Sequence, residues 1–230
     1  MSTYGQFCPV ARAMELLDQR WTLLVIRELI AGSRHFNDLH RGVPRMSTAL
    51  LTKRLRTLVR AGLVERREDR NRVIYELTGA GQELAPVVEA LGTWGTRWMP
   101  ELGEEHLDPH LLLWDLHRNL ELEAMPEGRT VLAFHLHDAR PDARDWWVVA
   151  TDDEVDLCDV DPGFEITARI EASLEALTRV WVGEMPWDRA VRSGSIRTIA
   201  PDHVRDQVPH WLKLSAYADV PRAAKAAPWT

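Results

Sequence analysis

Hydrophobic and polar positions between residues 47 and 60 alternate with the period of an amphipathic helix. Leu51, Leu55 and Leu58 stand at i, i+4 and i+7, which places them on one side of a helix that Ser47 can cap. The opposite side begins with small residues and ends with long bases: Ala49, Thr52, Lys53, Arg56 and Arg60. The segment therefore predicts a helix whose exposed face can approach a polyanion closely.

Three shorter apolar repeats precede this helix and predict helices within residues 9–17, 20–32 and 34–44. The first two are expected to supply the scaffold of a core through apolar positions: Val10, Met14, Leu17, Leu23, Leu24, Ile26, Leu29 and Ile30. A tight turn containing Gly42 joins the third helix to the helix that follows Ser47. This order predicts a helix-turn-helix, in which the second helix enters the major groove of DNA.

A basic hairpin is expected after Gly62, which ends the amphipathic helix. Residues 63–68 and 72–77 alternate like two short strands around the turn Asp69-Arg70-Asn71-Arg72. A helix-turn-helix followed by such a hairpin is a winged helix-turn-helix. We place this domain at residues 1–99.

Residues 78–99 predict a further helix with an apolar stripe on one side. Thr78 can cap it, and Pro86 is expected to kink it. The stripe consists of Leu84, Val87, Val88, Leu91, Trp94 and Trp98. A small domain has little left to cover such a stripe, so we expect a homodimer contact; the alternative is packing against a second domain.

Beyond Met99 the pattern changes, and the acidic residues 100–108 are expected to form a linker. Strands are then expected over 130–138, 145–151, 154–160, 164–170 and 195–200, and helices over 171–183, 186–194 and 203–214. A tight turn is expected at Asp152-Asp153, and a proline is expected to interrupt the last helix. Because strands precede helices, the order predicts an α+β domain over 109–230 rather than a doubly wound sheet.

Charge divides the chain in the same way. The 230 residues carry a net charge of −7, with 15 Lys/Arg against 10 Asp/Glu in residues 1–100 and 13 against 25 in residues 101–230. Within 41–72 alone there are 10 bases and 3 acids. This asymmetry is typical of a polyanion-binding module joined to an acidic domain, although a basic run can also be a solvated face.

Composition excludes several other classes. No apolar run reaches the length of a membrane span, and the opening MSTYGQFCPV lacks the features of a secretory signal, so a cytoplasmic protein without a membrane partner is expected. Cys8 and Cys158 are too few for a disulfide framework or a multi-cysteine zinc site. We expect no metal and no cofactor.

The segments RWTLLVIREL, HFNDL, LLTKRLRTL and GLVERR, with the later LTGAGQELAPVVEALGTWG, resemble the HxlR-type transcriptional regulators, a MarR-like winged-helix family. The similarity covers residues 7 to about 98. It implies a homodimer on a two-fold-related operator in double-stranded DNA, with the first and last helices of the domain at the dimer contact. Gln19-Arg20 stands where the family usually has Gly-Lys, and Arg45-Met46 stands where Gly-Ile is common.

This resemblance also implies which residues meet DNA. Those of the second helix would face base edges and phosphates, and those of the hairpin would lie on or near the wing. The set is Ser47, Thr48, Ala49, Thr52, Lys53, Arg56, Arg66, Arg67, Arg70 and Arg72.

The order strand, helix, glycine, helix, glycine, strand over residues 164–200 resembles the sterol-carrier-protein fold. That resemblance covers roughly 110–212 and implies an apolar cavity for a small hydrophobic or aromatic ligand. Seven of the ten tryptophans lie beyond residue 100, and buried Trp needs a partner for its N–H. The residues expected to line the cavity are Trp114, Phe134, Trp146, Trp147, Trp181 and Trp187; the alternatives are an aromatic core or a second dimer contact.

Catalysis finds little support in the sequence, and no catalytic residue is assigned. His135 and His137 share one face of a strand and Asp138 follows them, but two histidines on a half-exposed strand are more often surface residues. No Gly-rich phosphate loop, nucleophile elbow or HExxH motif is present.

Cys8 is the candidate for a redox role. Cys8-Pro9 puts the thiol at the N-cap of the first helix, where the helix dipole favours a thiolate. It also aligns with a cysteine that some members of the resembled family use as a sensor. The alternative is a small buried hydrophobe at the dimer contact.

These observations predict a dimeric, ligand-responsive transcription factor, acting as a repressor and not as an enzyme. Two alternatives come from other classes. One is a small-molecule carrier or sequestering protein whose winged helix serves dimerisation. The other is a sterol-carrier-like enzyme tethered to a DNA-binding module.

Overall fold

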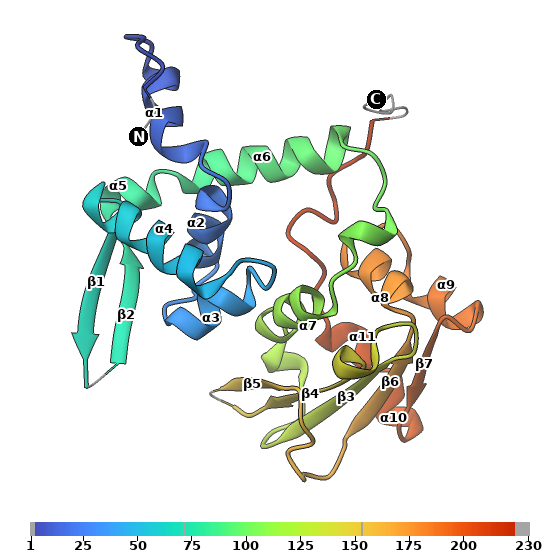
Figure 1. Cartoon of the computed structure of the whole chain (residues 1–230). Coiled ribbons are helices and arrows are strands. Elements are labelled where there is room, and N and C mark those ends of the chain that lie inside the picture. The colour runs from blue at the N-terminus through green and yellow to red at the C-terminus, as the bar shows by residue number, and fades with distance from the viewer. Residues whose placement is uncertain (1–2, 71, 153, 224–230) are drawn as a thin grey trace. The chain divides into compact units, whose positions relative to one another are not determined.

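The computed structural model describes residues 3–70, 72–152 and 154–223 (Figure 1). Contacts divide the chain into two compact units, residues 1–92 and 93–230, each with its own hydrophobic core. The boundary falls inside a helix, α6, upstream of the predicted linker. The functional division at 99 and 109 therefore stays a prediction.

The first unit is a winged helix-turn-helix, as the sequence predicts. Its elements in chain order are α1 (Pro9–Leu17), α2 (Thr22–Ile30), α3 (Phe36–Arg41), α4 (Thr48–Arg60), β1 (Val64–Asp69), β2 (Arg72–Leu77), α5 (Gly79–Gln82) and the first half of α6 (Ala85–Trp98), whose residues from 93 on belong to the second unit. The two strands form an antiparallel hairpin in which Arg66 lies opposite Tyr75 and Arg67 lies opposite Ile74. Arg70 in the turn has a φ of 45°, and Asn71 of that turn lies outside the described residues.

The core of this unit is built from α2, α3 and α4. Its buried members are Val25, Ile26, Leu29, Leu39, Val43, Met46, Leu51, Leu55, Leu58 and Val64. The expectation that α1 supplies scaffold residues is wrong for Val10 and Met14, because α1 buries no residue and Val10 is 70% exposed. Leu24 and Ile30 also lie on the surface, since the buried side of α2 is the one that carries Val25.

The region after β2 contains two helices where one kinked helix was expected. Thr78 caps the short α5, with its hydroxyl accepting the Gly81 N–H at 3.2 Å. A turn at Glu83 and Leu84 separates α5 from α6, and Pro86 stands at the second position of α6. Proline is tolerated there because the first helical N–H groups have no partner within the helix.

The second unit is an α+β fold around a five-stranded mixed sheet with the strand order β5-β4-β3-β6-β7 (Figure 1). The elements after α6 are η1 (Glu104–His106), α7 (Pro109–Arg118), η2 (Leu122–Ala124), β3 (Thr130–Leu136), η3 (Pro141–Ala143), β4 (Asp145–Ala150), β5 (Val155–Cys158), β6 (Ala168–Ala172), α8 (Leu174–Trp181), α9 (Trp187–Arg192), β7 (Ile196–Ile199), α10 (Asp202–Arg205) and α11 (Val208–Trp211). Helix α7 was not predicted. The split of the last helix into α10 and α11 confirms the expected interruption.

The fourth predicted strand, 164–170, is displaced: β6 begins at Ala168 and continues to Ala172. It pairs in parallel with β3, so the chain must first cross from the edge strand β5, and residues 159–167 make this crossing without regular structure. Thr167 ends the crossing, because its hydroxyl accepts the Val131 N–H at 3.0 Å. Asp153 of the predicted turn lies outside the described residues.

One face of the sheet carries the core of the second unit. Inward residues of β3, β4, β6 and β7 pack there against α7, α8 and α11, and the largest fully buried side chains include Phe134 and Trp211. The Trp211 indole N–H donates to the Ala124 carbonyl at 2.9 Å. Burial of these apolar side chains is the main force that holds the helices on the sheet.

Residues 213–223 form an irregular segment with turns at 216–219, here called the strap. Its Ser215 N–H donates to the Trp181 carbonyl at 2.9 Å. Arg222 then pairs with Glu184, and the Ala223 N–H donates to the Arg97 carbonyl of α6 at 2.9 Å. The strap thus fastens the end of α8 to the last turn of α6. Among the described residues, no helix is long and apolar enough to cross a membrane.

Candidate nucleic-acid interface and cavity

Helix α4 is set by a cap, a buried stripe and the turn before it. The Ser47 hydroxyl accepts the Leu50 N–H at 3.3 Å, and Leu51, Leu55 and Leu58 are buried. In the preceding turn, a ring nitrogen of His40 lies 2.8 Å from the Met46 carbonyl oxygen. The cap and the stripe follow the sequence prediction, whereas the His40 contact is an addition from the structure.

A buried carboxylate, Glu28, supports the same turn. Arg27 donates to it at 2.8 Å and also donates to the Gly42 carbonyl at 2.8 Å. A Cβ at Gly42 would lie 1.9 Å from the Glu28 carboxyl carbon, so a side chain at this position would displace the buried carboxylate. Sequence reasoning missed Glu28, although an acid on the apolar side of a predicted helix is a detectable signal. The pair holds the end of α3 at Gly42 against α2.

The outer face of α4 is largely exposed. Ser47, Thr48, Ala49, Lys53 and Arg56 lie on the surface, and within the described chain Lys53 and Arg56 form no hydrogen bond or ion pair through their side chains. Thr52 is half-buried, and its hydroxyl donates to the Thr48 carbonyl at 2.9 Å.

Arg54 belongs to a different side of α4. It donates to the Gln19 side chain at 2.7 Å and to the Arg20 carbonyl at 3.0 Å. Gln19 belongs to one of the two residue pairs that depart from the usual pattern of the resembled family. The contact ties the start of α2 to the middle of α4.

Both arginines of β1 form ion pairs with neighbouring carboxylates. Arg66 donates to Glu68 at 2.8 Å, and Arg67 donates to Glu65 at 2.6 Å. The hydrogen bond to Glu68 raises the pKa of Arg66, and the hydrogen bond to Glu65 raises that of Arg67. Both guanidinium groups are charged but must exchange these partners to bind a phosphate.

Arg70 and Arg72 stand at the tip of the hairpin. Both are exposed, and neither forms an ion pair with another described residue. The wing therefore has a free basic tip and a neutralised stem, a distinction that the sequence pattern alone did not indicate.

Four of the six residues expected to line a ligand cavity are buried in the second unit. Phe134, Trp146 and Trp181 belong to the core cluster, and Trp114 is buried. The Trp146 N–H donates to the Ala143 carbonyl at 2.9 Å. This arrangement supports the alternative of an aromatic core for these residues. Trp147 is half-buried on the other face of the sheet, and within the described residues its N–H has no partner.

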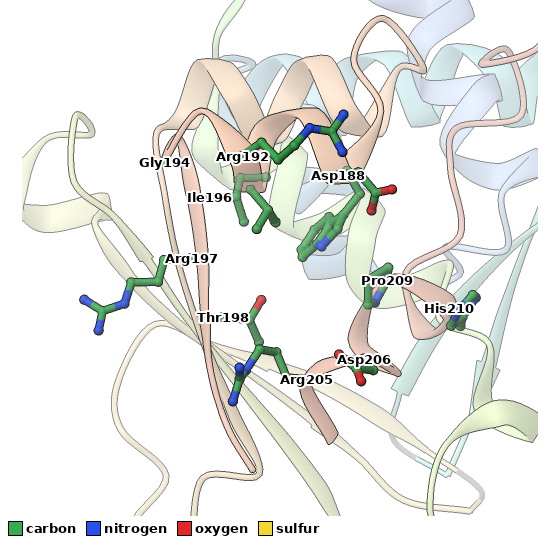
Figure 2. A pocket seen from close by; sticks show the side chains of 12 residues that line it. Asp188, Arg192, Gly194, Ile196, Arg197, Thr198, Arg205, Asp206, Pro209 and His210 are labelled. Carbon is green, nitrogen blue, oxygen red and sulfur yellow. The ribbon is translucent and has the colours of Figure 1, made fainter. Parts of the chain in front are cut away.

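Trp187 lines an open cavity of about 780 Å³ at the edge of the second unit (Figure 2). This space, here called the α9–β7 cavity, is bounded by α9, β7, α10 and α11. Its lining residues are Trp187, Asp188, Val191, Arg192, Gly194, Ile196, Arg197, Thr198, Arg205, Asp206, Pro209 and His210. Ile196 is buried at its base, while most of the charged residues are exposed.

The two reactive candidates differ in their surroundings. His135 on β3 forms a pair with Asp145 on β4 at 2.7 Å, and the described residues contain no cluster of three or more metal-binding side chains. Cys8 is a free, half-buried thiol at the N-cap of α1, and Pro9 is the first helical residue. The predicted position of Cys8 is therefore confirmed, while its redox role stays a prediction.

Comparison with known proteins finds relatives for the first part of the chain. The HxlR-like helix-turn-helix family matches residues 16–102. An uncharacterized HTH-type transcriptional regulator of Synechocystis sp. is 39% identical over 100 residues, which are 42% of this chain and 74% of that protein. YvaP of Bacillus subtilis, another uncharacterized HTH-type transcriptional regulator, is 33% identical over 99 residues, 41% of this chain and 92% of that protein. Among solved structures, the reduced form of the transcriptional regulator YodB from B. subtilis is 29% identical over 43% of this chain and 100% of that one, with a TM-score of 0.37.

Proposed function

The chain belongs to the HxlR-like helix-turn-helix family of transcriptional regulators, and we propose that it is a dimeric repressor of a specific operator. One observation carries the proposal: α4 presents small residues and unpaired bases on a single exposed face. Ala49 and Thr52 allow close approach to base edges, while Lys53 and Arg56 reach phosphates. Arg70 and Arg72 provide a second phosphate contact at the wing tip.

Exposed apolar side chains on α1 and α6 support the homodimer. Phe7, Val10 and Met14 at α1 are exposed, as are Leu91 and Trp94 of α6. Both helices also lack a buried residue within the chain. Several large apolar side chains exposed on one helix are typical of interaction surfaces. A second copy of the chain would cover them and would set the spacing of two α4 helices to one turn of DNA.

For the second unit we propose a ligand-responsive role over residues 109–230. Its helix and strand order supports the sterol-carrier-like interpretation, and the α9–β7 cavity has the volume of a small-molecule site. A ligand can regulate the repressor only by binding its free and DNA-bound forms with different affinity. If the chain does not bind DNA, the two alternatives are a carrier protein and a tethered enzyme.

The test is binding of the purified full chain to a labelled duplex from the region upstream of its own gene, measured by fluorescence anisotropy at several salt concentrations. If two protomers neutralise about six to ten phosphates, affinity must fall steeply as salt rises, because bound counterions are released. Arg189, an exposed base on α9, supplies the control: Arg189→Ala should bind DNA like the wild type. A complex that is insensitive to salt, or no complex with any duplex at low salt, refutes the proposal.

A further inference from the structure

We propose that the α9–β7 cavity binds an aromatic monocarboxylate, held by Arg192. Of the residues that the sequence analysis expects to line a ligand site, this cavity includes Trp187 and none of the buried ones. The inference rests on the proposed function only for its effect on DNA binding, because the chemistry of the cavity stands on its own residues.

The first argument is the apolar base of the cavity. Trp187 and Pro209 are half-buried in its wall, Ile196 is buried beneath it, and Val191 is an exposed apolar residue on α9. An aromatic ring fits a wall that combines an indole with aliphatic groups, since flat rings pack well on such surfaces. The Thr198 hydroxyl adds one polar group, and Figure 2 shows it directed toward the middle of the lining.

The second argument is Arg192. Its side chain is exposed, and it forms no hydrogen bond or ion pair with any other described residue. The other two arginines of the lining differ from it. Arg205 is held by Asp202 and by the Ala200 carbonyl, and Arg197 has Glu171 at 4.0 Å. In Figure 2 the Arg197 side chain also points away from the rest of the lining. A free guanidinium beside an apolar wall is suited to a carboxylate, which it can bind through two parallel hydrogen bonds.

The third argument limits the charge of the ligand. Asp188 and Asp206 also line the cavity, so its three arginines exceed its acids by a single charge. A polyanion such as a nucleotide triphosphate would be repelled by these carboxylates. A monoanion can instead place its charged end at Arg192 and its ring over the apolar base. His210, also in the lining, adds positive charge only when it is protonated.

Two fluorescent probes of similar ring structure separate the charged and apolar parts of this site. The probe 8-anilinonaphthalene-1-sulfonate carries one negative charge, whereas N-phenyl-1-naphthylamine has none. We expect Arg192→Gln to weaken binding of the sulfonate to the full chain by about tenfold or more, because a charge-assisted hydrogen bond is lost. The same variant should bind the neutral probe as the wild type does.

Arg189→Gln is the matched control, since it removes the same charge from the same helix outside the cavity lining. It should leave the affinity for both probes unchanged. Val191→Asp should weaken both probes, because it places a charge in the apolar wall at a position that is already exposed. Equal sulfonate affinity in the wild type and Arg192→Gln would overturn the site, as would equal weakening by Arg189→Gln.

Probe binding is measured without DNA, so its failure leaves the DNA proposal standing. The reverse case is also distinct. If the sulfonate binds through Arg192 while a saturating concentration leaves operator affinity unchanged, the site is supported and its regulatory role is overturned. A change in operator affinity that Arg192→Gln abolishes and Arg189→Gln retains supports both.

Discussion

Phe134 on β3 and Trp94 on α6 are both aromatic members of regular apolar patterns, yet Phe134 is 1% exposed and Trp94 is 47% exposed. The apolar residues around Phe134 are buried in the core of the second unit, because helices cover that face of the sheet. Among the described residues nothing buries the stripe that includes Trp94, since α6 contains no buried residue. Periodicity therefore identifies the apolar side of an element, while the remaining elements decide whether that side folds the chain or meets a partner.

The largest expected effect comes from the covered side. Phe134→Ala should lower the free energy of unfolding of the second unit by about 3 to 5 kcal/mol, because it removes a fully buried ring and leaves a cavity. Denaturant unfolding followed by Trp fluorescence measures this loss. A loss below about 1 kcal/mol would contradict the assignment of Phe134 to the core.

The uncovered side should behave in the opposite way. Trp94→Ala should change the unfolding free energy of either unit little but weaken dimerisation by about 2 kcal/mol or more, as expected of an interface Trp. Sedimentation equilibrium gives the dimer constant, and Val160→Ala, at an exposed apolar position away from α6, is the control. A wild-type dimer constant in Trp94→Ala would exclude α6 from the interface.

The basic residues of the first unit differ in a similar way, since some already have an intramolecular partner and others do not. Lys53→Ala should weaken binding to all DNA sequences about tenfold and reduce the salt dependence, because the Lys53 side chain has no competing partner among the described residues. Arg67→Ala should have a smaller effect, since Arg67 must first leave Glu65. Anisotropy titrations of both variants give the order, and a larger loss for Arg67→Ala would reverse the interpretation of the wing.

The smallest expected effect concerns Cys8, whose side chain makes no cap hydrogen bond. Cys8→Ser should keep wild-type DNA affinity under reducing conditions. If the thiol is a sensor, diamide releases DNA from the wild type and leaves Cys8→Ser bound, because the thiolate is the reactive species. Equal release from both proteins would assign Cys8 to packing.

Most of the winged helix could be predicted from local sequence patterns. The cap at Ser47 and the leucine stripe of α4 could be predicted because both depend on residues within a few positions of one another. The exposure of Val10 could not be predicted in the same way, since a stripe has the same period whether it faces the core or a partner. The close approach of Gly42 to Glu28 is a contact between positions distant in the sequence, so it could be seen only in the folded structure.

The second unit illustrates the same limit for sheets and sites. Strands β3 and β4 were predicted because their apolar runs are continuous. The start of β6 was misplaced, because parallel pairing with β3 leaves residues 159–167 to span the sheet. Trp187 was a candidate from composition, but Arg192 was not, because nothing local distinguishes a free surface arginine from a paired one.

The strap has a consequence for the topology of the second unit. Arg222 donates to the Met99 carbonyl at 3.3 Å across 123 positions of sequence, so the last described residues lie beside the first ones of this unit. A chain whose ends meet is nearly a ring, and the cost of closing a ring grows only slowly with its length. The order of the strands in the sheet is then independent of where that ring is opened. A circular permutant joined at the strap and cut within 159–167 is expected to keep every strand pair of the sheet, because the cut falls between the end of β5 and the start of β6 and removes no strand residue.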